Sequence, residues 1–523
     1  MLPEVLAASA ARIADGTFTA LWSQIQRTNG CAHPVRLTGT IHQADRATGE
    51  IRTVFDSASL PDGTILVPCG NRRATVCPSC SYLYAGDAWQ IVHAGVSGGF
   101  GVPDTVAEHP GLFVTVTAPS FGLVHSRRSN HGPAVRCSTH PGRCRHGRPR
   151  GCPQVHPDDD PRLGAPICQD CADSSGLVVW NRYAARLWKR TVDLTYRRMA
   201  RLTGLPLEGS PGNPGIRRRI RISYIKVAEA QRRGAIHYHG VLRLDDATMP
   251  PGTWEPPGEP WATAQLLATC WRWAVRHAVQ PCPDPHRYDL PSTLVPHPVA
   301  RPPMADVRWG EQERTVALTV DGGELTPRTV GNYLAKYVTK SVTDSGALDR
   351  RIRNADDLHE RLAFLPDHQA ELVRAAWRLA ARPAFRELGM AKWAHQFGFN
   401  GHWITKSRSY STTFAQCRER RRTWARAHTP AGGDRAPLDA WGRPEDDDVV
   451  ITFAEWEFHA SGYARTGDRL LAEMAADQAR SRREAARDDR AQARIDDGPG
   501  AHRQVTARAA YPTPSVNGEA LPS

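Results

Sequence analysis

The spacing of apolar residues along the chain predicts a mixture of short strands and longer helices. β-Branched and aromatic residues fill positions 112–117, which is typical of a buried strand. Apolar residues recur every three to four positions through 177–202, and Gly204 and Pro206 end this predicted helix. We also expect helices at 1–30, 261–277, 326–340, 356–387 and 465–494, and strands at 35–41, 64–67, 217–225 and 316–320. The pattern therefore indicates an α+β fold.

Residues 228–242 are predicted to form two strands joined by a tight turn. A three-residue loop at 232–234 would place Glu229 directly opposite His237, and directly opposed residues share a face of the sheet. His239 projects from the same face, because successive strand side chains alternate. Two imidazoles and a carboxylate on one face can hold a divalent cation. A register change of one residue would instead leave Glu229 as a surface carboxylate on the other face.

A second group of candidate residues lies on the helix expected at 326–340. Tyr333, Lys336, Tyr337 and Lys340 are separated by three and four positions, so they share one helix face. Tyrosine is a poor nucleophile until its proton is removed, and a nearby cation stabilises the phenolate. Only six of the 67 basic residues are lysines, and two of the six stand here. The alternative is a pair of buried tyrosines beside lysines that reach out to solvent.

The composition is that of a globular protein, with 40% hydrophobic and 23% charged residues in a chain of 523, enough for several domains. No run approaches 18 uninterrupted apolar residues and the N-terminus has no secretion signal, so we expect a cytoplasmic protein without a membrane partner. The net charge of +13 favours an acidic partner, and nucleic acid is the first candidate. A merely basic protein is the alternative.

Nine of the twelve cysteines stand at or before position 171, and clustered cysteines in a reducing compartment are more often metal ligands than disulfides. Cys77 and Cys80 have the spacing of a zinc knuckle, with Cys69 and Cys31 as the expected third and fourth ligands of a structural Zn²⁺.

A loop-rich insertion at about 132–175 carries a second pair with the same spacing, Cys168 and Cys171. Together with Cys144 and Cys152 they would form a four-thiolate Zn²⁺ site. The segment has too few apolar residues to fold alone, so metal binding would supply its stability. The insertion also holds a fifth cysteine and several histidines, and the spacing does not decide which cysteine is left over.

A His-x-His pair alone is weak, since about one is expected by chance among 21 histidines. Here, however, the strand 113–117, the hairpin ending in His237-Tyr238-His239 and the helix 333–340 follow one another in the order of the three motifs of HUH endonucleases, which this chain resembles. The last motif resembles the two-tyrosine version. Tyr238 departs from the aliphatic residue of the family pattern.

Over residues 30–430 the chain is similar to the RepSA-type replication initiators of actinobacterial plasmids, on the segments 69–80, 229–239 and 398–408. The resemblance implies a central antiparallel sheet of the HUH type flanked by helices. The division it suggests is a zinc-knuckle module at 1–105, the endonuclease domain with its zinc-binding insertion at 106–345, a helical basic DNA-binding region at 346–430, and a linker, charged helix and disordered tail at 431–523.

The resemblance also implies a mechanism. Mg²⁺ or Mn²⁺ held by His237, His239 and Glu229 polarises a phosphate of single-stranded plasmid origin DNA, and a tyrosine attacks it, leaving a 5′-phosphotyrosine link and a 3′-OH primer. Tyr337 heads the Tyr-x-x-Lys most like that of single-tyrosine members, but the choice between Tyr333 and Tyr337 stays open.

Partners follow from the same resemblance. Lys406 and Arg408 are candidate DNA contacts in a basic, aromatic-rich segment. No lysine follows a glycine, so a phosphate-binding GKS or GKT loop is missing and a separate helicase of the host or plasmid replication machinery is expected. A two-tyrosine HUH transposase and a non-catalytic, zinc-dependent DNA-binding regulator are the alternative functions.

Overall fold

The structure is a computed structural model with two compact units, one of Met1–Asp87 and Thr413–Ser523 and the other of Ala88–Thr412. The residues it describes are 2–127, 135–287, 304–318, 326, 329–331, 333–334, 348, 350–427 and 449–496. Both units combine antiparallel sheets with helices, as the apolar pattern predicted. The grouping differs from the four consecutive segments expected, because a strand near the C-terminus pairs with the first strand of the chain.

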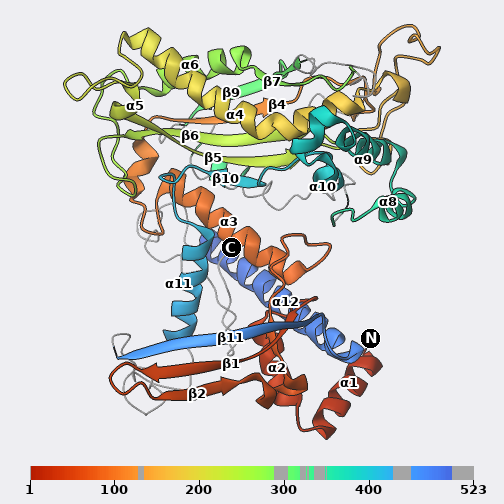
Figure 1. The fold of residues 1–523 in the computed structure, drawn as a ribbon, viewed down its shortest axis with the longest axis vertical. Helices are drawn as coiled ribbons and strands as arrows, with labels where there is room; N and C mark the ends of the chain where they lie inside the picture. Colours follow the sequence, from red (N-terminus) through yellow and green to blue (C-terminus); the bar gives the residue numbers. More distant parts are fainter. Residues whose placement is uncertain are drawn as a thin grey trace, which may run out of the picture. The chain divides into compact units, whose positions relative to one another are not determined.

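The larger unit is built on a five-stranded sheet in the order β10-β5-β6-β4-β9, with antiparallel pairing throughout (Figure 1). Its strands are β4 (Gly111–Thr117), β5 (Ile220–Ala230), β6 (Ile236–Asp246), β9 (Glu313–Ala317) and β10 (Ile404–Lys406). The strand expected at 112–117 is confirmed, and the one expected at 316–320 begins three residues earlier. The central strands β5, β6 and β4 have mostly buried side chains on both faces, so other parts of the chain cover both sides of the sheet.

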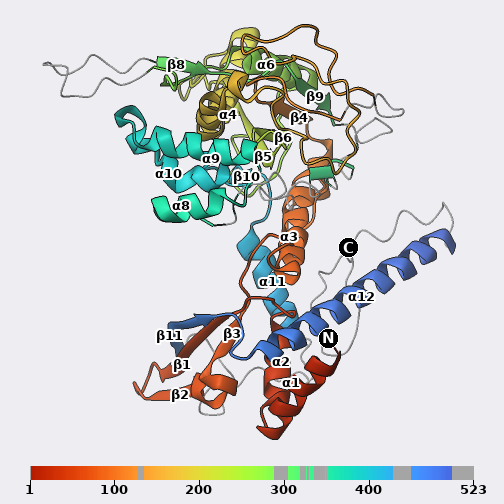
Figure 2. The ribbon, with the colours of Figure 1, turned by 90° about the vertical axis from the view of Figure 1, so that its right-hand side faces the viewer.

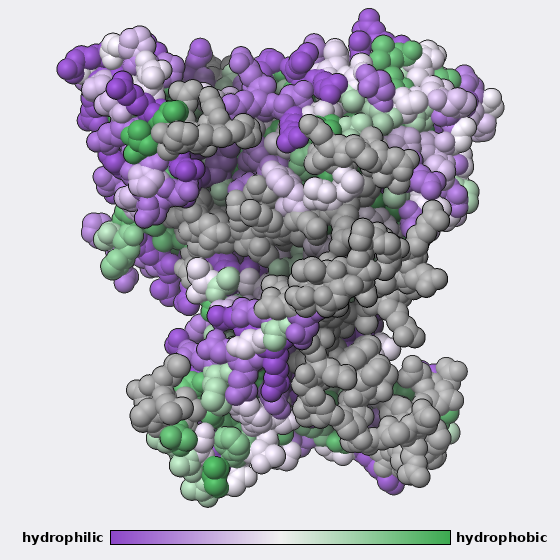
Figure 3. Space-filling model, turned by 180° about the vertical axis from the view of Figure 1, so that it is seen from behind, coloured by the Kyte–Doolittle hydropathy of each residue, from purple (hydrophilic) through white to green (hydrophobic). Residues whose placement is uncertain are grey.

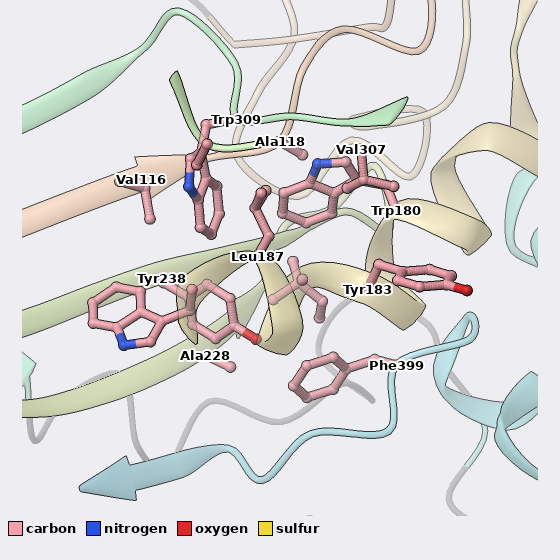
Figure 4. Packing of buried hydrophobic residues seen from close by; sticks show 14 of the residues in the cluster. Val116, Ala118, Trp180, Tyr183, Leu187, Ala228, Tyr238, Val307, Trp309 and Phe399 are labelled. Atoms are coloured by element: carbon pink, nitrogen blue, oxygen red, sulfur yellow. The ribbon is translucent and has the colours of Figure 1, made fainter. Parts of the chain in front are cut away.

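One face of this sheet is covered by α4 (Ser174–Thr203), with α6 (Ala264–His277) beside it (Figure 1). The Asp173 side chain caps the first turn of α4, and Gly204 ends the helix in the left-handed conformation, close to the predicted limits. Figure 4 shows Trp180, Leu187, Tyr238 and Trp309 among the side chains that fill the layer between α4 and the sheet. This layer is the main hydrophobic core of the unit.

The central hairpin has the register that its turn predicts. Gln231 donates to the carbonyl of Ala235 at 2.9 Å, and Gly234 has a positive φ of 83°. Glu229 consequently pairs with His237 across β5 and β6, so the predicted register is confirmed. Because the turn is local and glycine tolerates this backbone conformation, the chain itself specifies which residues face each other.

Shorter elements complete the larger unit. The helical pair expected at 356–387 is α8 and α9, and Figure 2 shows this helical group beside the sheet. The remaining helices and strands of the unit are α5 (Ile216–Arg219), β7 (Gln280–Pro283), β8 (Met304–Val307), α8 (Ala355–Leu362), α9 (Asp367–Ala380) and α10 (Met390–Trp393), with 3₁₀ turns at Asp104–Glu108, Gln169–Cys171, Pro383–Leu388 and Ala394–Gln396.

The smaller unit has a sheet in the order β11-β1-β2, with β3 also paired to β1. The expected C-terminal linker and tail omitted β11 (Val450–Ser461), which pairs with β1 (Val35–Asp45) along its whole length. The other elements of this unit are α1 (Leu2–Ala14), α2 (Phe18–Arg27), β2 (Ile51–Asp56), β3 (Ile65–Val67), α11 (Phe414–Ala427) and α12 (Thr466–Asp496), with 3₁₀ turns at Ser57–Ser59 and Pro61–Gly63, while α3 (Pro78–Ser97) contains the boundary between the units.

The charged helix expected at 465–494 is confirmed as α12, which runs beside α1 and α2 (Figure 2). Arg12 of α1 is 1% exposed and its Nε donates to Asp468 of α12 at 2.9 Å. Leu21 and Ile25 of α2 pack against α12 in a small apolar cluster. These contacts explain why a helix with so many charged residues is held in the unit.

Hydrophilic residues cover most of the coloured surface seen in Figure 3, with apolar residues in scattered groups. Across the described ranges, no helix combines the length and the apolar character needed to cross a membrane.

Candidate functional site

The two histidines of the central hairpin project from one face of β6, with their ring centroids 4.4 Å apart. Tyr238 between them points to the opposite face, where its ring lies 5.7 Å from Trp188 and 6.1 Å from Trp309. A bulky aromatic residue therefore suits the position between the histidines, since it fills the core beneath α4.

Glu229 reaches the histidine pair from the neighbouring strand. Its Oε2 lies 3.2 Å from Nε2 of His239, whose side chain is buried. The structure thus brings the three predicted ligands of the divalent cation together on one face, with Glu229 directly paired to His237.

Two threonines of β4 lie within hydrogen-bond distance of the Nδ1 atoms of the two histidines. The hydroxyl of Thr115 lies 3.1 Å from Nδ1 of His239, and that of Thr117 lies 3.1 Å from Nδ1 of His237. A hydrogen bond at one ring nitrogen fixes the ring and leaves the other nitrogen for a ligand. Sequence reasoning overlooked the two threonines, although their alternation in the strand at 113–117 is the signal that would have revealed them.

Burial keeps the first histidine neutral. Burial, together with the adjacent His239, lowers the pKa of His237 to about 4. The neutral imidazole is the form that binds a metal ion, so His237 is in its ligand form at neutral pH. Two imidazole nitrogens and one carboxylate oxygen form a donor set that can bind a divalent metal ion.

Of the two tyrosines predicted as nucleophiles, Tyr333 lies among the residues that the structure describes. Its ring stands edge-on to His239 at 5.3 Å and to Phe113 at 5.4 Å, and 38% of the residue is exposed. A tyrosine thus lies beside the histidine pair, open to solvent on one side. Tyr337, Lys336 and Lys340 lie outside the described residues.

The first cysteine cluster contains the four residues expected from the zinc-knuckle spacing. Cys31, Cys69, Cys77 and Cys80 each offer a sulfur, and the four sulfur atoms lie within 4.8 Å of one another. Sulfur–sulfur distances of 3.6–3.7 Å match the edge of about 3.8 Å expected for a tetrahedron with zinc–sulfur bonds of about 2.3 Å. The cluster can hold a metal ion such as zinc.

The second cluster differs from the expected set in one residue. Cys144, Cys168 and Cys171 come together with His146 rather than with Cys152. The reason is local, because the chain makes a tight turn directly after Cys144. The N–H of Gly147 donates to the carbonyl of Cys144 at 2.9 Å, and this turn brings His146 back to the cluster. The Nδ1 of His146 then lies 3.3 Å from the sulfur of Cys171. Cys152 belongs to a different group of side chains.

The two candidate DNA contacts have different surroundings. The ammonium of Lys406 donates to the backbone carbonyl of Ser411 at 2.9 Å, and burial lowers its pKa. Arg408 is exposed two residues later. Lys406 therefore closes the loop that follows β10, whereas the side chain of Arg408 is exposed to solvent.

Comparison with known proteins decides the family. A family model described as RepSA, replication initiator protein, pSAM2, matches residues 17–477. The chain belongs to this family. A replication initiator protein of Streptomyces ambofaciens is 37% identical over 482 residues, which cover 91% of this chain and 94% of the relative. No solved structure matches the chain. The matched range includes residues of both units and β11.

Proposed function

We propose that this chain initiates plasmid replication as an HUH-type endonuclease that nicks and rejoins single-stranded origin DNA through a tyrosine. The relative of the same family carries the name replication initiator protein. The observation that carries the catalytic part is the contact between Glu229 and His239 at 3.2 Å, with the Tyr333 ring 5.3 Å from the same histidine. These distances support a tyrosine nucleophile beside a set of metal ligands.

In this mechanism Glu229, His237 and His239 would hold Mg²⁺ or Mn²⁺, and the bound ion would polarise the scissile phosphate. The phenol of Tyr333 or Tyr337 loses its proton, and the phenolate oxygen attacks phosphorus. The bond from phosphorus to the 3′ oxygen breaks, and that oxygen takes a proton to become the 3′-OH primer. The DNA 5′ end stays joined to the tyrosine until the second tyrosine or water releases it.

The side chains of the protein contribute orientation and charge. Thr115 and Thr117 fix the histidine rings, and burial keeps His237 neutral so that it serves as a ligand rather than as an acid. Lys336 and Lys340, each three residues after a tyrosine, stabilise the phenolate. Arg408 and the net charge of +13 attract the DNA backbone, and the duplex is opened by a separate helicase.

The test is a nicking assay on overlapping oligonucleotides that cover the plasmid origin and are labelled at their 3′ ends. With Mn²⁺ present we expect a labelled band at the position of a covalent protein–DNA adduct on a denaturing gel, and none after chelation. The band should vanish in Tyr333→Phe/Tyr337→Phe, and the two single variants show which tyrosine attacks first. A double variant with unchanged activity would support the non-catalytic regulator instead.

The metal ligands are tested with His237→Ala. We expect nicking to be lost while binding of duplex origin DNA persists, because the histidine acts on the phosphate and not on DNA recognition. His277→Ala is the matched control, since this exposed histidine bonds only to Trp273 of its own helix α6 among the described contacts. Loss of both nicking and binding in His237→Ala would show a structural role for His237 and contradict the proposed site.

A further inference from the structure

A third group of ligand side chains lies where the insertion joins the sheet. His125, Cys137, Cys152 and His156 each offer one nitrogen or sulfur, and these atoms all lie within 4.8 Å of one another. We propose that this group is a structural Zn²⁺ site of the Cys₂His₂ type, separate from the two clusters described above. The proposal is independent of the nicking activity.

The distances fit a tetrahedral ion. Nδ1 of His125 is 3.2 Å from Nε2 of His156, and the sulfur of Cys152 is 3.5 Å from the same Nε2. Bonds of about 2.0 Å to nitrogen and about 2.3 Å to sulfur give tetrahedral edges of about 3.3 and 3.5 Å. The Cys137 sulfur is 4.0 Å from Nδ1 of His125, so this edge of the tetrahedron shortens when the zinc ion binds.

The surrounding groups also indicate a metal. Asp160 Oδ2 lies 2.7 Å from Nδ1 of His156, which leaves Nε2 of that ring directed at the cluster. A carboxylate behind a histidine ligand is the usual outer partner at zinc sites. Arg162 holds Asp160 in turn, with its Nη2 2.7 Å from Oδ2. The backbone N–H of Ser126 donates to the Cys137 sulfur at 3.2 Å, as expected for a thiolate ligand.

This assignment explains the use of cysteine in the chain. The nine cysteines at or before position 171 are divided four, three and two among the clusters, and the clusters with three and two cysteines reach four ligands with one and two histidines. His156 is 1% exposed, Cys137 2% and Cys152 6%, although the insertion around them has little apolar core. Buried polar ligands without an apolar core are stabilised when a metal joins them.

The site also places the insertion against the catalytic hairpin. His125 exchanges backbone hydrogen bonds of 2.8 Å with Gly164 and Ala165. Gly164 in turn lies so close to the backbone of Arg232 that a Cβ would collide with it. Arg232 stands in the turn between β5 and β6. The zinc ion therefore anchors the insertion to the turn between β5 and β6, the two strands that carry Glu229, His237 and His239.

The experiment is a zinc count on the full-length protein by mass spectrometry of the native chain and by elemental analysis. We expect three zinc ions per chain in the wild type and two in Cys137→Ser and His156→Ala. Cys417→Ser is the matched control, because this buried cysteine belongs to none of the clusters, and it should keep three.

Asp160→Asn is a second variant, for the case in which a ligand variant fails to fold. It keeps all four ligands and changes only the carboxylate that is hydrogen-bonded to His156. We expect it to hold three zinc ions but to lose the third to a chelator about 10–100 times more readily. Zinc content equal to that of the wild type in both Cys137→Ser and His156→Ala would overturn the proposal. A Cys137–Cys152 disulfide, seen as thiols that alkylate only after reduction, would overturn it as well.

Discussion

Asn181 of α4 holds the turn of the central hairpin, and replacing it with alanine tests how the candidate site is positioned. The residue is fully buried, and its amide nitrogen donates to the carbonyls of Gly234 and Phe397 at 2.9 Å each. Its side-chain oxygen accepts from the N–H of Ile236, also at 2.9 Å. One side chain therefore joins the turn and the first residue of β6 to the helix beneath.

Asn181→Ala leaves one buried N–H and two buried carbonyls without these partners. An unsatisfied buried group costs about 1–3 kcal/mol, and part of the loss is recovered where water enters. We therefore expect the free energy of unfolding of the larger unit to fall by about 3–6 kcal/mol. Because the same turn sets the register of Glu229 with His237, we also expect weaker binding of Mn²⁺.

The assay combines urea unfolding, followed by circular dichroism, with hydrogen exchange of peptides that cover 228–242. Asn354→Ala is the control, since this exposed asparagine accepts a single bond at the start of α8, from Asp357, and its loss should cost only about 1 kcal/mol. A fall in the free energy of unfolding of less than about 1 kcal/mol in Asn181→Ala, or one no larger than in Asn354→Ala, would contradict this prediction. Unchanged hydrogen exchange in the hairpin would contradict it as well.

Further predictions concern the histidine rings, a buried lysine and the cysteine clusters. Thr117→Val should weaken Mn²⁺ binding about 10–100-fold by releasing Nδ1 of His237, as measured by calorimetry, and His277→Ala should not. Burial lowers the pKa of Lys226 to about 7, so folding favours the neutral amine and the free energy of unfolding should rise from pH 7 toward pH 10. Lys226→Met should remove that rise and raise stability at pH 7; an unchanged pH profile would contradict this. Cys77→Ser should lower the melting temperature of the smaller unit and release one zinc ion, whereas equal zinc content in variant and wild type would exclude a zinc ion at that cluster.

Local chemistry explains what could be predicted about the site. The turn at 232–234 fixes the pairing of Glu229 with His237, because a three-residue loop ending in glycine allows one register. The spacing of Cys77 and Cys80 similarly directs two sulfur atoms to one point. These features depend on residues a few positions apart, where backbone geometry leaves few alternatives.

The parts that could not be predicted depend on segments far apart in the chain. The strand β11 was missed although its β-branched and aromatic residues favour a strand. What the sequence could not indicate is its partner, because β1 lies more than 400 residues earlier. Cys152 was assigned to the wrong group. Nine cysteines and several histidines can be combined into many four-ligand sets, and the conformation of the loops between them decides which set comes together.

The sequence alone determined several of the longer elements, the hairpin register, the first cysteine cluster and the family, because each rests on local spacing or on an ordered set of motifs. Only the tertiary structure decided that Thr115 supports His239 and that Tyr333 lies beside it. It also decided that the two ends of the chain share a sheet. Those contacts join segments that are far apart in the sequence. Sequence spacing does not indicate which distant segments meet, because that depends on how the side chains pack in the folded protein.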